Sequence, residues 1–369
     1  MRLARVDLYR LNLPMLTPFE TSFGTESDKD FLLVEASDGE HSGWGECVAS
    51  AGPFYSEETT KTALVILMDH LLGRLEGEVA DPQEASERMS AVRLNPMAKS
   101  AIETALWDLS ARRKGVSLSR LIGGTRTKVP VGISIGIQPS SAALVEQMKR
   151  RLDQGYQRIK IKIKPGYDVE IVRAVRRALP DVPLMVDANS AYTLADTKRL
   201  KALDDFGLMM IEQPLGHDDL IDHAALQAEL KTAICLDESI RSAHILEQAH
   251  AIGALRVVNI KIGRLGGLGE SLKTVAAARR LGLDVWCGGM LESGVGRALN
   301  VAITSLEGFT LPGDTAATSR YFGEDIADPP FELTADGCLA VPEGPGLGVD
   351  VIKERVLRHA VDHQVWTAS

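Results

Sequence analysis

Four charged residues recur at nearly even spacing in the middle of the chain: Asp187, Glu212, Asp237 and Lys261, separated by 25, 25 and 24 residues. Each directly follows a short apolar run, namely 183–186, 208–211, 233–236 and 257–260. Such runs are typical of buried strands, and the interval leaves room for one amphipathic helix after each strand. The carboxyl ends of parallel strands meet at one mouth when the sheet closes. The spacing therefore predicts one site, although each charge taken singly also fits a helix cap or an isolated surface charge.

The three acids, which we call the carboxylate row (Asp187, Glu212 and Asp237), would repel one another and raise each other's pKa if left alone. A divalent cation relieves that repulsion. Oxygen ligands without nearby Cys or His suit a hard ion, so the row predicts Mg²⁺, with Mn²⁺ as the alternative. Three protein ligands leave coordination positions open for a substrate carboxylate, which predicts a small-molecule carboxylate as the partner.

Lysines flank this row on two sides. Lys160 and Lys162 lie on the strand before Asp187 and share one face because strand residues alternate, whereas Lys261 follows the last apolar run. A like charge, a dication and burial would lower a lysine pKa from about 10.4 to roughly 7–8. A neutral lysine removes a proton next to a metal-bound carboxylate, and the metal stabilises the enediolate. The alternative is a basic strand whose side chains reach solvent.

Regular alternation of strands and helices over 126–320 predicts the elements that hold these residues. The eight expected strands are 129–136, 158–163, 183–186, 208–211, 233–236, 257–260, 283–286 and 309–312. This pattern predicts a (β/α)8-type barrel. A doubly wound open sheet is the alternative, but it would gather the charges at one switch point. Neither a Gly-x-Gly-x-x-Gly segment nor a P-loop supports nucleotide binding.

Residues 1–125 do not follow this repeat. Expected strands at 3–13, 31–36 and 43–48 and helices at 57–75 and 95–114 predict a separate α+β domain. Two aromatic, Gly- and Pro-containing loops, 17–24 and 51–55, are either lids or ordinary connections with buried rings. The Pro- and Gly-rich segment 341–348 lies in a C-terminal part, 321–369, that we expect to pack back on the first domain.

Composition excludes several classes of protein. The chain has 369 residues, 45% of them apolar, with a net charge of −9 and no basic block, which argues against nucleic-acid binding. The four cysteines form no Cys-x-x-Cys pair, which argues against a zinc ribbon or a redox motif; they are Cys47, Cys235, Cys287 and Cys338. Without a signal peptide or a membrane-spanning run, a cytoplasmic location is expected.

The charged motifs resemble the muconate-lactonising-enzyme subgroup of the enolase superfamily, and more closely its o-succinylbenzoate synthase / N-succinylamino acid racemase branch. These motifs are Lys160-x-Lys162, Asp187-Ala-Asn189, Glu212-Gln-Pro, Asp237-Glu238 and Asn259-Ile-Lys261. Further similar stretches are 18–24, 132–137, 285–294 and 311–315. The resemblance covers nearly the whole chain and implies a (β/α)7β modified TIM barrel with an N-terminal α+β capping domain that the C-terminal segment completes.

The resemblance also implies residue roles. Mg²⁺ would lie on the carboxylate row, with Lys162 and Lys261 as acid and base and Lys160 tuning Lys162. The expected substrate-binding residues are Ser134, Asn189 and Met290 in the barrel, Phe19 and Tyr55 in the capping loops, and Arg264, which is typical of members that also racemise. Met290 is alternatively barrel core, which is the preferred interpretation for Trp286, and Asp314 either orients a lysine or caps a turn. Members are commonly homo-oligomers.

Two outcomes follow from one enediolate: o-succinylbenzoate synthesis by dehydration, as in menaquinone biosynthesis, and N-acylamino acid racemisation. Dipeptide epimerases and muconate cycloisomerases share the same acids and lysines and remain alternatives, which the capping loops and the segment 311–315 disfavour. No histidine lies at the end of the seventh strand, where other subgroups place a base. A metal-dependent binding protein without turnover would be expected to lack one of the lysines, yet Lys162 and Lys261 are both present.

Overall fold

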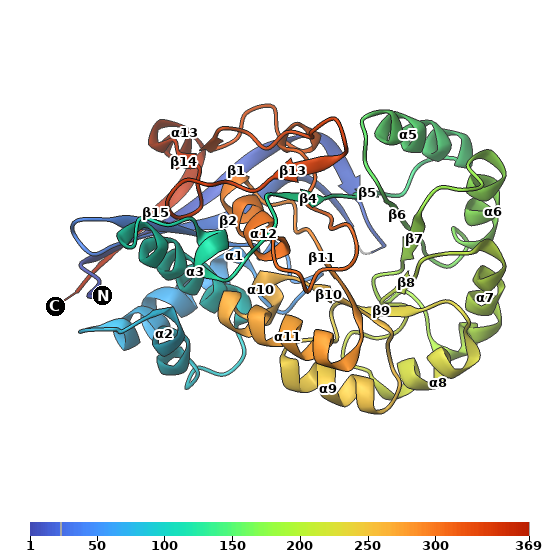
Figure 1. The fold of residues 1–369 in the computed structure, drawn as a ribbon, viewed down its shortest axis with the longest axis horizontal. Coiled ribbons are helices and arrows are strands. Elements are labelled where there is room, and N and C mark those ends of the chain that lie inside the picture. The colour runs from blue at the N-terminus through green and yellow to red at the C-terminus, as the bar shows by residue number, and fades with distance from the viewer. Residues whose placement is uncertain (23, 369) are drawn as a thin grey trace.

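The last strand of the chain pairs with the first, so both ends of the described chain lie on one side of the molecule (Figure 1). The structure is a computed structural model and describes residues 1–22 and 24–368. Its antiparallel sheet has the order β15–β1–β2–β3, with β1 (Arg5–Glu20), β2 (Thr25–Ser37), β3 (Ser42–Cys47) and β15 (Ala360–Thr367). The prediction that the C-terminal segment packs back on the capping domain is therefore confirmed.

The hairpin of β1 and β2 is longer than the sequence predicted. Residues 17–20, expected in a loop, continue β1, and Phe19 pairs with Glu26 of β2. The pairing shifts register between Pro14 and Phe19. An irregularity of this kind bends and twists a hairpin, which local sequence patterns do not reveal. Phe23, at the tip of the predicted loop, lies outside the described residues.

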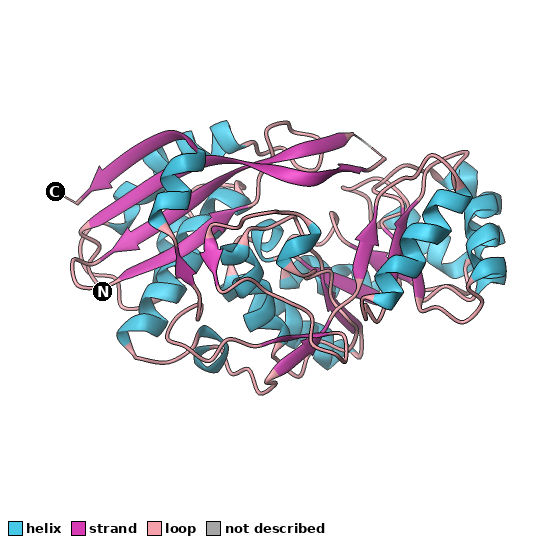
Figure 2. Ribbon diagram, turned by 90° about the horizontal axis from the view of Figure 1, so that it is seen from above, coloured by secondary structure: helices cyan, strands magenta, loops and turns pink. Residues whose placement is uncertain are grey.

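This hairpin reaches over the parallel strands (Figure 2). Near its end, Ile137 N donates to the carbonyl oxygen of Glu20 at 3.1 Å, and Ser22 Oγ donates to that of Asn189 at 3.4 Å. The capping domain therefore touches the barrel at the carboxyl ends of its strands.

The capping domain packs its long helix directly on β3. Its helices are α1 (Thr60–Ile66) with the irregular turns η1 (Leu67–Leu71) and η2 (Leu72–Leu75), α2 (Pro82–Met89), α3 (Pro96–Arg113) and α4 (Leu118–Leu121). Gly43 and Gly45 of β3 allow the close approach, since a Cβ atom at Gly43 would lie 2.2 Å from the Ala105 carbonyl oxygen. At Gly45 a Cβ atom would lie 2.1 Å from the Ala101 carbonyl oxygen, so larger residues at either position would force the helix away.

Seven parallel strands form a curled sheet in the order β11–β10–β9–β8–β7–β6–β5. The strands are β5 (Ile133–Ile135), β6 (Ile159–Lys162), β7 (Leu184–Asp187), β8 (Ile211–Glu212), β9 (Ile234–Leu236), β10 (Val257–Ile260) and β11 (Asp284–Cys287). Between or after them run α5 (Ser141–Asp153), α6 (Val169–Ala178), η3 (Leu194–Asp196), α7 (Thr197–Lys201), η4 (Ala202–Phe206), α8 (Ile221–Glu229), α9 (Ala243–Ala251), α10 (Ile262–Leu265), α11 (Leu268–Leu281) and α12 (Gly294–Thr304). The helices α5 to α9 and α11 lie on the outside of this curl (Figure 1). The predicted barrel architecture is confirmed.

The predicted eighth strand, 309–312, is wrong as a regular strand. The segment 309–314 instead bridges the two edges of the curled sheet through a few separate backbone hydrogen bonds. On one edge Asp314 N donates to the Cys287 carbonyl oxygen at 2.8 Å, and on the other Gly132 N donates to the Gly313 carbonyl oxygen at 2.7 Å. Pro312 lacks an N–H group, which prevents an uninterrupted ladder at this position.

The remaining elements belong to the C-terminal part and its neighbours. They are β4 (Lys128–Pro130) paired with β13 (Cys338–Ala340), β12 (Ala327–Asp328) paired with β14 (Asp350–Val351), η5 (Thr318–Arg320) and α13 (Lys353–His359). One buried apolar cluster joins Leu11 and Phe31 of the capping sheet to barrel residues. Because this cluster crosses between the two parts, the domain boundaries expected at residues 125 and 320 stay a prediction. Among the described residues, no helix is both long and apolar enough to cross a bilayer.

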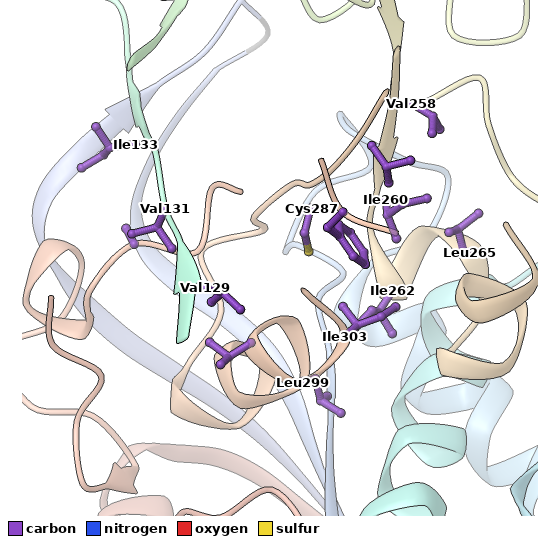
Figure 3. Packing of buried hydrophobic residues seen from close by; sticks show 14 of the residues in the cluster. Val129, Val131, Ile133, Val258, Ile260, Ile262, Leu265, Cys287, Leu299 and Ile303 are labelled. Carbon is purple, nitrogen blue, oxygen red and sulfur yellow. The ribbon is translucent and has the colours of Figure 1, made fainter. Parts of the chain in front are cut away.

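Apolar side chains from both edges of the curl meet around α12. Figure 3 shows Leu299 and Ile303 of α12, which belong to one buried cluster with Val129 of β4, Ile260 of β10 and Cys287 of β11. Burial of such side chains stabilises by roughly 1.5–3 kcal/mol each. This packing fixes the segment that follows β11, which carries Met290.

Two buried glutamates fasten the capping domain to barrel helices. Glu103 of α3 accepts hydrogen bonds from Leu268 N at 2.8 Å and Gly269 N at 2.9 Å, at the start of α11. Glu46 of β3 accepts from the backbone of Ser293 and Gly296 at the start of α12. The first N–H groups of a helix lack partners within the helix, so these carboxylates satisfy them across the domain contact.

The Glu103 carboxyl makes stability depend on pH. Burial raises its pKa to about 7, from 4.5. A carboxyl whose pKa is raised in the folded state stabilises most below 4.5, and this contribution is lost as pH rises through about 7. As the pH rises from 5 to 8, we expect the free energy of unfolding of the wild type to fall by about 2 kcal/mol more than that of Glu103→Gln. Urea unfolding of both proteins at both pH values measures this difference. Glu87→Gln, at an exposed glutamate, is the control, and an equal difference between it and the wild type would contradict the prediction.

Candidate active site

The parallel register brings the predicted residues to one layer of the barrel interior. Lys162 lies beside Asp187, and Asp187 lies beside Glu212 in the neighbouring strand. Asp237 and Lys261 directly follow β9 and β10. Beneath this layer lies a second, apolar cluster formed by Met185, Met210, Cys235, Val257 and Trp286. Trp286 is therefore core, as expected, and the charged layer rests on an apolar floor.

Every acid of the carboxylate row is buried and contacts a cation. Lys162 Nζ lies 2.6 Å from Asp187 Oδ2, and Lys261 Nζ lies 2.8 Å from Asp237 Oδ2. Arg264 contacts the other oxygen of Asp237. These contacts offset the repulsion that three adjacent carboxylates would otherwise create.

Lys160 joins the row to Asp314. Its Nζ lies 2.7 Å from Asp314 Oδ2, 3.0 Å from Glu212 Oε2 and 3.4 Å from Asp187 Oδ2. It also lies 4.7 Å from the centre of the Trp286 ring, a favourable cation–π distance. Of the two roles expected for Asp314, orienting a lysine is the one the contacts favour.

Burial and charge act against each other on Lys160 and Lys261. Burial alone lowers the pKa of Lys160, but Asp314, Glu212 and Asp187 together raise it above its ordinary value. Burial also lowers the pKa of Lys261, and the neighbouring Tyr55, Glu238 and Glu212 raise it overall. The protein's own charges therefore act opposite to the predicted lowering, which depends on the dication.

The acids respond unequally to the same surroundings. Burial raises the pKa of Asp187, but Lys162 and Lys160 overcome it and hold that pKa well below its usual range. Burial and the Asp187 charge raise the pKa of Glu212. Burial and the same charge raise the pKa of Glu238, the acid directly after Asp237. Glu212 and Glu238 thus lie in surroundings that disfavour their charged forms, whereas Asp187 is stabilised as a carboxylate.

The donor set fits a hard cation, although lysine contacts keep the acids apart. Among the described residues, no three acid, histidine or cysteine side chains are gathered closely enough to form a ready metal cage. The row offers only carboxylate oxygens. Beside it, Glu238 Oε2 and Asn259 Oδ1 are buried without a hydrogen-bond partner. Buried oxygen atoms of this kind are suitable partners for a cation or its water.

A pocket of about 680 Å³, counting its open mouth, lies above the charged layer, between barrel and capping domain. The predicted residues that line it are Phe19, Tyr55, Ser134, Lys160, Lys162, Asn189, Lys261 and Met290. Ser134 Oγ is buried there without a partner. Met290 therefore faces the pocket.

Arg264 and the three acids of the row do not line this pocket; they lie beneath the lysines. Arg264 Nε donates to the Ile240 carbonyl oxygen at 2.8 Å, Nη1 donates to Asp237, and Nη2 donates to the Asn259 carbonyl oxygen. It therefore holds Asp237 in place.

The capping loop 51–55 reaches Lys261 through Tyr55, and Phe19 of the other capping segment lines the same pocket. Tyr55 OH donates to Asp237 Oδ1 at 3.0 Å and lies 3.1 Å from Lys261 Nζ, which also sits over its ring. Asn189 Oδ1 accepts from Lys162 Nζ at 2.6 Å. Of the two roles considered for these loops, the position of Tyr55 agrees with a lid.

Sequence reasoning missed several pocket residues: Glu26, Lys29 and Ser50 of the capping domain, and Leu291 and Tyr321 of the barrel side. Lys29 lies in an acidic stretch, Asp28-Lys29-Asp30, that is typical of a solvated surface. Strand alternation is the signal that could have identified Lys29 as buried. Phe31 and Leu33, two and four positions later, lie on the same face of the strand and pack into the barrel-side core.

Comparisons with known proteins agree with this geometry. Residues 5–123 match the mandelate racemase / muconate lactonizing enzyme N-terminal domain, and residues 143–355 match the enolase C-terminal domain-like family. An o-succinylbenzoate synthase of Geobacillus stearothermophilus is 54% identical over 369 residues, covering 98% of both chains. An N-succinylamino acid racemase of Thermus thermophilus is 47% identical over 350 residues, covering 95% of both.

Among solved structures, an enolase superfamily member from Listeria innocua has a TM-score of 0.95 at 43% identity, covering 100% of this chain and 99% of that one. The match extends over capping domain and barrel alike. The chain belongs to the enolase superfamily, in the branch that contains these o-succinylbenzoate synthases and N-succinylamino acid racemases.

Proposed function

We propose that the protein removes the proton alpha to a substrate carboxylate and that this step serves two reactions: dehydration to o-succinylbenzoate and racemisation of N-succinylamino acids. The observation that carries the proposal is the placement of Lys162 and Lys261 on opposite sides of the carboxylate row, both facing one pocket. The named relatives, at 54% and 47% identity over almost the full chain, support both reactions.

Asp187, Glu212 and Asp237 would hold a Mg²⁺ ion, with Mn²⁺ as the alternative. Enzymes of this superfamily generally use Mg²⁺. When bound, the ion supplies electrostatic stabilisation of the negative charge that the substrate carboxylate gains as the proton leaves, typically several kcal/mol. The all-oxygen donors and the unpartnered Glu238 Oε2 support this assignment.

Charge balance supports a neutral lysine as the base. Five buried acids and five buried bases form the network around the row: Asp187, Glu212, Asp237, Glu238 and Asp314, with Arg158, Lys160, Lys162, Lys261 and Arg264. A dication together with the one substrate carboxylate that lies at the row leaves one positive charge in excess. Loss of a proton from one lysine removes that excess, which favours a neutral amine at the substrate.

Lys160 is poorly suited to that role. Asp314, Glu212 and the Trp286 ring all stabilise its ammonium form. Lys162 and Lys261 are therefore the candidate base and acid. In racemisation, one Nζ takes the Cα proton and the other ammonium returns a proton to the opposite face. In dehydration, one Nζ takes the proton, hydroxide leaves, and the second ammonium stays beside the intermediate.

Other residues would bind or orient the substrate. Ser134, Asn189 and Met290 from the barrel and Phe19 and Tyr55 from the capping domain would contact it, since all five line the pocket. Arg264 would act through Asp237. A binding protein without turnover has no need of two lysines on opposite sides of one pocket, which disfavours that alternative.

The test is α-proton exchange in deuterated water with Mg²⁺ and each enantiomer of N-succinylphenylalanine, followed by NMR. A parallel assay follows o-succinylbenzoate formation from its cyclohexadiene precursor. We expect exchange of both enantiomers and formation of the dehydration product. Absence of both activities would overturn the proposal, whereas activity on dipeptides or muconate alone would favour the alternative members of the subgroup.

Removal of divalent cations provides a second test. Because the row would hold the ion that stabilises the developing charge, we expect dialysis against EDTA to lower exchange by at least about a thousandfold. Excess Mg²⁺ or Mn²⁺ should restore it. The Asp237→Asn variant should need more Mg²⁺ for half-maximal exchange, and exchange that is unaffected by EDTA would contradict the assignment.

A further inference from the structure

Lys29 of β2 is a buried cation that forms no ion pair with a described residue, although its charge acts through space on the buried Glu46, lowering a pKa that burial raises. Its side chain is 1% exposed and lines the pocket from the capping domain. Nζ donates to the Met290 carbonyl oxygen at 2.7 Å. A lysine ammonium has three donors, and among the described residues no carboxylate lies within 4 Å of this one.

The other lysines of the pocket differ in this respect. Lys160, Lys162 and Lys261 each contact at least one carboxylate at 3.0 Å or less. Glu26 lines the same wall as Lys29 but is not within ion-pair distance, and it accepts a hydrogen bond from Ser50 Oγ at 2.9 Å. Burial of a charge without a counter-charge is unfavourable. An anion from the ligand would supply the missing partner.

We propose that Lys29 binds a second, distal carboxylate of the substrate, the one that ends its succinyl arm. This inference rests on the proposed function, in which the first carboxylate lies at the row in the barrel. Lys29 lies on the opposite, capping-domain wall of the same pocket. The substrate is thus a dicarboxylate held at both ends, and N-acylamino acids whose acyl arm ends in a neutral group are poor substrates.

The competing explanation is that Lys29 only ties β2 to the segment after β11 through Met290. Two substrates separate these roles: N-succinylphenylalanine and N-succinamoylphenylalanine, in which a carboxamide replaces the distal carboxylate. If Lys29 has only a structural role, its replacement lowers kcat/KM for both compounds alike. If Lys29 binds the distal carboxylate, its replacement lowers kcat/KM for N-succinylphenylalanine alone.

The experiment compares kcat/KM for α-proton exchange of both compounds, with Mg²⁺, in the wild type, Lys29→Met, Lys29→Arg and Lys164→Met. Lys164 is a matched control, since its side chain is 40% exposed and outside the pocket lining. We expect the wild type to prefer the succinyl compound by about 10- to 100-fold. Lys29→Met should lose this preference, mainly through KM, and Lys29→Arg should keep part of it. Lys164→Met should leave it unchanged.

An equal loss for both compounds in Lys29→Met, or no preference in the wild type, would overturn the inference while the proposed function stands. If the wild type exchanges neither compound, the racemisation part of the proposed function fails, and calorimetric binding of the two compounds decides about Lys29. A difference in Kd that disappears in Lys29→Met supports the distal site. Equal Kd values, or no binding of either compound, overturn it.

Discussion

Replacement of Lys162 or Lys261 by alanine is expected to lower the kcat of racemisation by about 10²–10⁴-fold. Each variant should still exchange the α-proton of one enantiomer, and the two variants should spare opposite enantiomers. The reason is geometric: the two Nζ atoms approach the pocket from opposite sides of the row, so each one serves a single face of the substrate. The double variant should exchange neither enantiomer.

The fold should survive either change, because each acid keeps a second cation. Asp187 retains Lys160 at 3.4 Å, and Asp237 retains Arg264. Exchange is measured by NMR for each pure enantiomer in deuterated water. Lys164→Ala, on an exposed lysine next in the same chain segment, is the control and should match the wild type. Loss of exchange for both enantiomers in each single variant would contradict the division of labour.

The positions of the charged residues were predictable because the main signal for them is local. Each charge of the row follows an apolar run, and the repeat distance identifies a strand and a helix without knowledge of the neighbours. Lys160 and Lys162 follow from alternation in one strand. These regularities come from backbone geometry, so Asp187, Glu212, Asp237 and Lys261 could be assigned to one layer from sequence alone.

Other features depend on contacts between distant segments, which spacing does not encode. Asp314 contacts Arg158 and Lys160, more than 150 positions earlier, so sequence left two roles open for it. Pro312 removes the donor that a regular eighth strand would need, although the segment has the apolar pattern of one. Lys29 resembles a surface lysine until the fold covers it.

Replacement of Asp314 by asparagine is expected to destabilise the protein by about 3–5 kcal/mol, because it leaves two buried cations without their shared carboxylate. Asp314 Oδ1 lies 2.7 Å from Arg158 Nη1, and Oδ2 lies 2.7 Å from Lys160 Nζ. All three side chains are at most 5% exposed. Arg158 keeps the Pro312 carbonyl oxygen and the Trp286 ring, which do not replace a negative charge.

The dependence on pH identifies the cause of that loss. Burial raises the pKa of Asp314, but Arg158 and Lys160 overcome it and lower the pKa to about 2, from 3.8. A carboxyl with a lowered folded pKa stabilises above 3.8, and the contribution is lost as pH falls through about 2. The deficit of Asp314→Asn should therefore be constant between pH 5 and 7 and should narrow as pH falls below 3.8.

Urea unfolding across this range measures the deficit. The matched control is Asp336→Asn: Asp336 also pairs with a lysine, Lys128, and its pKa is likewise about 2, but both side chains are more than half exposed. Solvent screens an exposed pair, so the control should change stability little. If Asp314→Asn lowered the free energy of unfolding as little as this control does, the stability of the buried network would not depend on Asp314. Arg158 and Lys160 would then draw their stabilisation from the carboxylate row and the Trp286 ring alone.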